Sequence, residues 1–212
     1  MRKALLVSAA LLAAACAGKP PPSWQADAHG SLERYSAAYL AGEARIAQAE
    51  FTRARAGLAA AGRADLVARA ELVRCAAAVA SLEFGDCPGF EAMRADAPLD
   101  ERAYAAWLSG KASADDIARL PVHHRAVALG NAEALAEIED PFARLVAAGV
   151  LMRTNRAAPG TIALAIDTAS TQGWRRPLLA WLGVQKQRAE QAGDAAAAEA
   201  IGRRIKLVGG ER

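Results

Sequence analysis

Beyond about residue 24, apolar residues recur at the spacing of a helix, and no stretch alternates at the period of two that a β-strand requires. Between residues 43 and 61 they follow one another at steps of four and three: Ala47, Phe51, Ala54, Leu58 and Ala61. Val, Ile and Thr are scattered, and hairpin dipeptides such as Asn-Gly are absent. The sequence therefore predicts an all-α fold with Phe51 deep in its core.

The next predicted helix, over residues 66–82, is apolar on two faces. One stripe contains Leu66, Ala70, Val73, Ala77 and Ala80, and the other contains Ala68, Leu72, Cys75, Val79 and Leu82. At about 100° per residue, Leu66 and Cys75 lie on opposite sides of the helix. A helix of this kind is covered on both sides, as happens when helical hairpins stack.

Proline and glycine divide the rest of the chain into short helical segments. The predicted helices cover residues 99–109, 113–120, 141–153, 159–172, 177–192 and 194–208, with Ser113, Asp140 and Asp194 at helix starts. Roughly a quarter of the chain is alanine, so helices can approach closely. The very short turns predict stacked antiparallel hairpins forming one domain over residues 24–212.

The N-terminal segment has the pattern of an export signal. Met1, Arg2 and Lys3 precede an apolar run from Ala4 to Ala15 that only Ser8 interrupts. That run is shorter than the about 20 apolar residues that span a bilayer, and its length and flanks are typical of a secretory signal.

The end of this segment, Leu12-Ala13-Ala14-Ala15-Cys16, resembles the lipobox of bacterial lipoproteins. The resemblance implies that residues 1–15 are removed and that Cys16 carries the lipid. Residues 16–23 would then form a proline-rich tether. Ala17, where an Asp tends to mark inner-membrane retention, implies the periplasmic face of the outer membrane, although inner-membrane anchoring stays open. Ala13 departs from the Leu usual there, and an ordinary secretory signal is the alternative.

Two cysteines remain in the exported domain, and we expect Cys75 and Cys87 to form a disulfide. Closure requires the helix containing Cys75 to end near residues 82–84, with Gly85 turning the chain back and Pro88 opening the next element. The alternatives, a metal site or a catalytic thiol, have little support because no CxxC pair or nucleophile motif is present.

Gly42-Glu43 followed by Ala47, Phe51 and Ala54 is similar to the second helix of a tetratricopeptide repeat, and Gly193-Asp194 with Ala198 and Ile205 is a fainter match. The resemblance implies a right-handed array of hairpins whose surface binds other proteins. No full unit recurs at the repeat length of the family. A generic alanine-rich hairpin explains the same residues.

No pattern in the chain indicates a catalytic, cofactor or metal site. The side chains of the adjacent pair His123-His124 point about 100° apart on a helix, so the two cannot readily coordinate one metal ion. The acidic pairs Asp115-Asp116 and Glu139-Asp140 (with Glu137 nearby) fall where helix boundaries are expected. Arg175-Arg176, between Trp174 and Trp181, could bind an anionic polymer, but a structural role is favoured.

Charge excludes one class of partner. The formal net charge is +3, and removing Arg2 and Lys3 with the signal leaves 24 basic against 23 acidic residues. A nearly neutral domain is not typical of nucleic-acid binding.

From the anchor, the helical hairpins and the lack of a catalytic pattern, we expect a lipid-anchored, non-enzymatic adaptor that binds a protein of the cell envelope or of a secretion system. The alternative is an accessory cell-wall hydrolase or another envelope enzyme. A shallow groove lined by aliphatic and arginine side chains favours the adaptor, and a buried carboxylate in a deep groove favours the enzyme.

Overall fold

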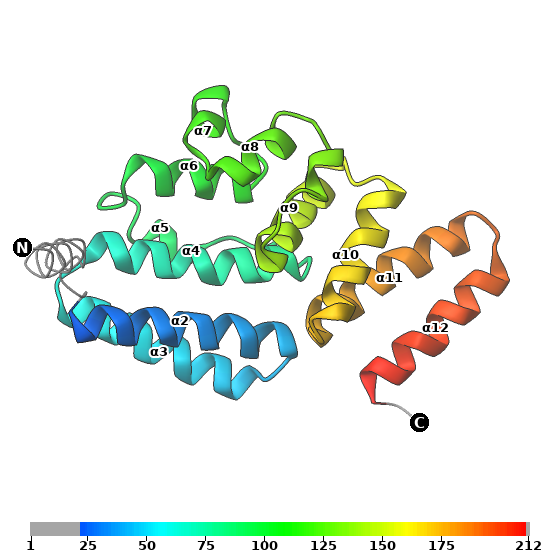
Figure 1. The fold of residues 1–212 in the computed structure, drawn as a ribbon, viewed down its shortest axis with the longest axis horizontal. Helices are drawn as coiled ribbons and strands as arrows, with labels where there is room; N and C mark the ends of the chain where they lie inside the picture. The colour runs from blue at the N-terminus through cyan, green and yellow to red at the C-terminus, as the bar shows by residue number, and fades with distance from the viewer. Residues whose placement is uncertain (1–21, 211–212) are drawn as a thin grey trace, which may run out of the picture.

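The computed structural model describes residues 22–210, which form an all-α fold without a β-strand in that range (Figure 1). The predicted signal and Cys16 lie outside the described residues. The helices are α2 (Ser23–Ala41), α3 (Ala44–Ala60), α4 (Ala64–Ala80), α5 (Pro88–Glu91), α6 (Leu99–Leu108), α7 (Ala114–Arg119), α8 (Val122–Ala128), the 3₁₀ turn η2 (Glu133–Leu135), α9 (Pro141–Arg153), α10 (Pro159–Thr171), α11 (Arg175–Gln191) and α12 (Ala195–Gly209).

Helix α4 is the centre of the fold, as its two apolar stripes predict. The α2–α3 hairpin covers one side of α4, and α5, α6 and α9 pack on the other (Figure 1). Ala70 and Ala77 belong to the core cluster shared with α2 and α3, where Phe51 is also buried. Leu72 and Val79 belong to the larger cluster shared with α6, α9, α10 and α11. Both predicted faces of the helix are therefore confirmed as buried.

The second half of the chain continues as a row of packed helices. Helix α9 packs on α4, and each of α10, α11 and α12 then packs on the helix before it. The short helices α5 to α8 come between α4 and α9 in the sequence; α5 lies against α4, and α6, α7 and α8 form a layer above α4 in Figure 1. The hairpin packing of an all-α fold is thus present. The tetratricopeptide-like repeat stays a prediction, because this inserted layer separates α4 from its neighbour α9 in sequence.

Three predicted helix starts have the expected caps. The side chains of Asp140 and Asp194 accept hydrogen bonds from the Ala143 and Ala197 backbone N–H groups. Ser113 and Asp116 form a capping box at the start of α7, and the backbone N–H and hydroxyl of Ser113 hold the pKa of Asp116 below its usual range. One member of each predicted acidic cluster, Asp116 and Asp140, is therefore explained by helix capping.

Helices α4 and α9 cross at Gly149, where the two backbones are almost in contact. A methyl group on Gly149 would lie 2.3 Å from the carbonyl oxygen and 2.9 Å from the carbonyl carbon of Val79. A side chain at this position must therefore push α9 away from α4. The glycine sets the distance between the central helix and the second half of the chain.

We expect Gly149→Ala to destabilise the protein by about 1–3 kcal/mol, because overpacking at the crossing outweighs the better helix propensity of alanine. Gly183, on α11, is a matched control, since nothing lies within 4 Å of the position of its added methyl group. Gly183→Ala should leave stability unchanged or raise it by up to about 1 kcal/mol. Urea unfolding of both variants measures the difference. A Gly149→Ala variant as stable as Gly183→Ala would contradict the proposed packing constraint.

Candidate functional site

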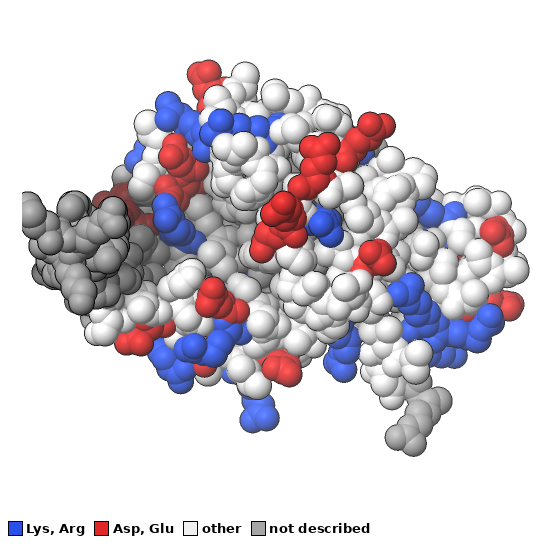
Figure 2. All heavy atoms as spheres, in the orientation of Figure 1, with Lys and Arg blue, Asp and Glu red and all other residues white. Residues whose placement is uncertain are grey.

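The surface is hollowed between α4 and the layer formed by α6, α7 and α8, and the space-filling view shows this hollow facing the viewer (Figure 2). We call it the α4–α6–α8 groove, and its volume is about 490 Å³. Its lining residues are Arg69, Leu72, Val73, Ala76, Asp100, Glu101, Tyr104, Arg119, Leu120, Pro121, Val122, Arg125 and Phe142.

The floor and one edge of the groove are apolar. Leu72, Ala76 and Leu120 are buried beneath it. Val122, the first residue of α8, stands on the edge with 76% of its surface exposed. An exposed aliphatic side chain next to an apolar floor suits contact with another apolar side chain.

The acidic side chains of the groove are already partnered. Arg69 Nε donates to Glu101 Oε1 over 2.8 Å, and the Glu101 side chain is only 7% exposed. Asp100 lies 3.8 Å from Arg119 Nη1. Arg125 donates Nε to the Leu120 carbonyl over 2.8 Å and makes no ion pair with a described residue. The groove therefore presents arginine guanidinium groups rather than free carboxylates.

An aromatic cluster supports the groove from below. The ring of Tyr104 lies 5.4 Å from that of Trp107, which stacks 4.3 Å from the imidazole of His124. Burial raises the pKa of Tyr104, so its hydroxyl is neutral at physiological pH. Burial, with a smaller effect from His123, lowers the pKa of His124 to about 3, so this imidazole is uncharged in the folded protein. The cluster is thus uncharged at neutral pH.

The two adjacent histidines face different surroundings, as the sequence suggests. His124 is 2% exposed and its buried Nδ1 has no hydrogen-bond partner, whereas His123 is exposed. Within residues 22–210, no group of three His, Cys, Asp or Glu side chains could hold a metal ion. Glu137 and Glu139 are exposed in the turn before α9.

Arg176 and Trp181 connect the two halves of the chain. Arg176 donates to the Tyr39 carbonyl and to Glu83 Oε1, each over 2.9 Å, and its guanidinium lies over the Tyr39 ring. Trp181 is fully buried and donates Nε1 to the Ala80 carbonyl over 3.1 Å. These contacts agree with the structural role that the sequence favours for this arginine–tryptophan segment, over the binding of an anionic polymer.

Cys75 and Cys87 lie at disulfide distance, with their Cα atoms 6.0 Å apart. The chain turns back as predicted, but earlier. Helix α4 ends at Ala80, and Leu82, at φ 59°, begins the turn that was expected at Gly85. Pro88 opens α5 as predicted.

We expect alkylation of the unfolded, unreduced protein, taken directly from its native cells, to modify neither Cys75 nor Cys87. Reduction before alkylation should expose both, and peptide mapping by mass spectrometry distinguishes the two results. The bond closes a short loop, which on the loop-entropy account stabilises the fold by about 3 kcal/mol. Two thiols that react without reduction would exclude the disulfide.

Comparison with protein-family models, with curated proteins and with solved structures finds no match to this chain. Among the described residues, no helix has both the length and the apolar character needed to cross a membrane.

The groove itself was not predicted from the sequence. Its residues come from five helices and one turn spread from Arg69 to Phe142, and no local motif connects them. The available signal was weak: arginine residues at positions 69, 119 and 125 beside apolar stretches.

Proposed function

We propose that this protein is a non-enzymatic adaptor that holds a segment of an envelope or secretion protein in the α4–α6–α8 groove. The supporting observation is the lining of the groove, which combines a buried aliphatic floor with Arg119 and Arg125 at its margin. Such a surface suits a segment that inserts an apolar side chain and presents an acidic or carbonyl oxygen to the guanidinium groups.

The groove gives less support to the alternative, a hydrolase. Glu101 is its buried carboxylate, but Arg69 donates to it from the rim of the groove. Nε and Nη2 of Arg69 both donate to Oε1 of Glu101, so this oxygen is already occupied and is not available to exchange a proton with a substrate. The adaptor is therefore the better-supported function.

The adaptor is proposed to be anchored through a lipid on Cys16 and to face the periplasm from the outer membrane. The support is the sequence pattern alone: an apolar run, small residues before Cys16 and a proline-rich segment after it. We expect Cys16→Ser to abolish labelling by a fatty-acid analogue and to leave residues 1–15 uncleaved by the lipoprotein peptidase. Unchanged labelling of the variant would refute the anchor and leave the groove proposal intact.

A photoreactive amino acid at Val122 tests the docking site in native cells. Leu129 gives a matched control, because it follows the other end of α8, is 73% exposed and does not line the groove. We expect one discrete crosslinked protein from position 122 and none from position 129. Equal products from both positions, or none from either, would count against the groove as the binding site.

A further inference from the structure

The charges of the described chain are separated along its length. Residues 175–210, which contain α11 and α12, hold seven basic and three acidic residues. Residues 22–174 hold fifteen basic and nineteen acidic residues. The C-terminal hairpin therefore has a net charge of +4, whereas the rest of the described chain has a net charge of −4. Figure 2 shows the blue side chains gathered over α12, at the end of the molecule far from α2.

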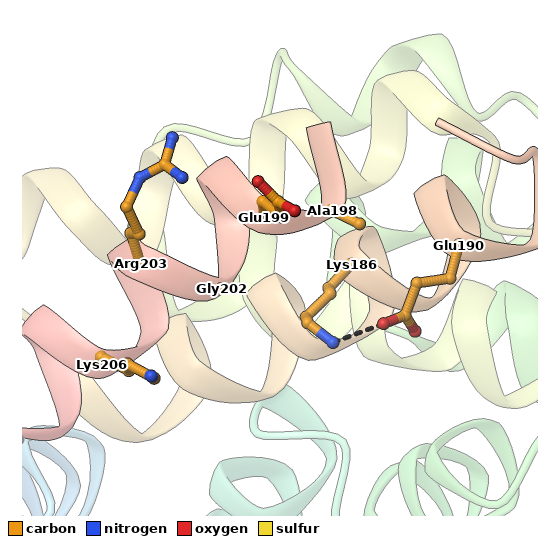
Figure 3. Close-up of a pocket in the computed structure, with 7 residues that line it drawn as sticks. All are labelled: Lys186, Glu190, Ala198, Glu199, Gly202, Arg203 and Lys206. Carbon is orange, nitrogen blue, oxygen red and sulfur yellow. Dashed lines mark hydrogen bonds and ion pairs between the residues drawn. The ribbon is translucent and has the colours of Figure 1, made fainter. Parts of the chain in front are cut away.

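Three of these basic residues and two of the acidic ones line a notch of about 380 Å³ between α11 and α12 (Figure 3). Lys186 and Glu190 come from α11 and pair with each other across one turn, whereas Glu199, Arg203 and Lys206 come from α12. Gly202 leaves room for the Lys186 stem, whose Cε lies 3.5 Å from the position of an added methyl group. Arg203 and Lys206 form no ion pair with a described residue.

Helix α12 also carries a largely exposed apolar side chain, on the side of the helix opposite the buried Ala198. Leu207 is 79% exposed, directly after Lys206 and one helical turn after Arg203. Only Ala198 of α12 is buried, so the helix leaves its outer face without a partner in the described chain. A leucine beside cations is a pattern with which helices enter the interface of a membrane, where phosphates bind the cations and the leucine reaches the acyl boundary.

We propose that this face, made by Lys186, Arg203, Lys206 and Leu207, binds the surface of a membrane rich in anionic phospholipid headgroups. The charge complementarity and the protruding leucine carry the assignment, which is independent of the α4–α6–α8 groove. Because α12 and the start of α2 lie at opposite ends of the long axis in Figure 1, contact at α12 gives the molecule a second point of attachment, distant from its N-terminal end.

Vesicle flotation of the full chain carrying Cys16→Ser tests the proposal without a lipid anchor. Vesicles of phosphatidylcholine alone measure the background from the N-terminal segment. Vesicles of phosphatidylethanolamine with about one third phosphatidylglycerol measure the charge-dependent binding. We expect Arg203→Gln with Lys206→Gln to weaken this binding about 30-fold, since each cation near an anionic surface contributes about fivefold. Leu207→Ser should weaken it about fivefold.

Matched controls distinguish the effect of this face on vesicle binding from the effect of the net charge of the protein. Arg45 and Lys111 are exposed and form no ion pair with a described residue, so Arg45→Gln with Lys111→Gln removes the same charge elsewhere. We expect that double variant, and Leu129→Ser, to bind as the parent does. Equal loss in the control pair, or unchanged binding of the Arg203 and Lys206 pair, would overturn the proposal. So would displacement from the vesicles by inorganic phosphate at an ionic strength where chloride has no effect, which would assign the notch to a free phosphate.

Discussion

Replacing Trp181 by alanine is expected to lower the free energy of unfolding by about 3–5 kcal/mol, the largest effect of a single substitution that we predict. The side chain is fully buried where α11 meets the end of α4. Its removal leaves a cavity and deprives the buried Ala80 carbonyl of the indole N–H. A direct contact between α11 and the end of α4 is then lost.

Two further variants show which part of Trp181 matters. Trp181→Phe keeps most of the apolar volume and should cost less, about 1–2 kcal/mol, mainly through the lost hydrogen bond. Trp174 is only half-buried, so Trp174→Ala should cost less than Trp181→Ala. Urea unfolding followed by circular dichroism measures all three. A Trp181→Ala variant no less stable than Trp174→Ala would contradict the proposed anchoring of α11.

Acid is expected to destabilise the fold through His124. The pKa of this imidazole is about 3 in the folded protein and near 6.5 when the chain is unfolded. Between these values the unfolded state binds a proton that the folded state does not, so stability falls as the pH falls. The contribution is fully present above about pH 6.5 and should decrease by about 2–3 kcal/mol by pH 4.5.

The substitution His124→Phe tests this assignment, because a phenyl ring can stack on Trp107 and does not titrate. We expect the variant to lose most of the difference in unfolding free energy between about pH 6.5 and 4.5. The exposed neighbour supplies the control: His123→Gln should keep that difference. Retention of the full pH dependence in His124→Phe would show that another group is responsible.

Local patterns in the sequence were sufficient to predict the helices but not how the helices pack on one another. The two stripes of residues 66–82 indicated a helix covered on both sides, and Ser113, Asp140 and Asp194 correctly marked helix starts. Periodicity cannot show which helix covers a face, so the packing of α9 on α4 through Gly149 was not predicted. The groove depends on that arrangement and was therefore missed as well.

The turn after α4 shows a second limit. Gly85 was expected to turn the chain back there, and glycine is the residue that adopts positive φ without steric cost. Leu82 takes that conformation instead, with its side chain packed against the larger core cluster. Burial of an apolar side chain can offset the backbone cost of a positive φ, and no residue-type preference reveals that in advance.

The most direct test of the adaptor proposal measures the crosslink from position 122 when the charge of the groove is changed. Arg119→Glu with Arg125→Glu reverses the two rim charges, and Arg45→Glu with Lys111→Glu makes the same change outside the groove. Equal thermal unfolding of the two double variants establishes that both are folded. The adaptor account predicts that the yield of the crosslinked product falls at least about tenfold in the groove variant and is unchanged in the control. A crosslink that persists in the groove variant would contradict it.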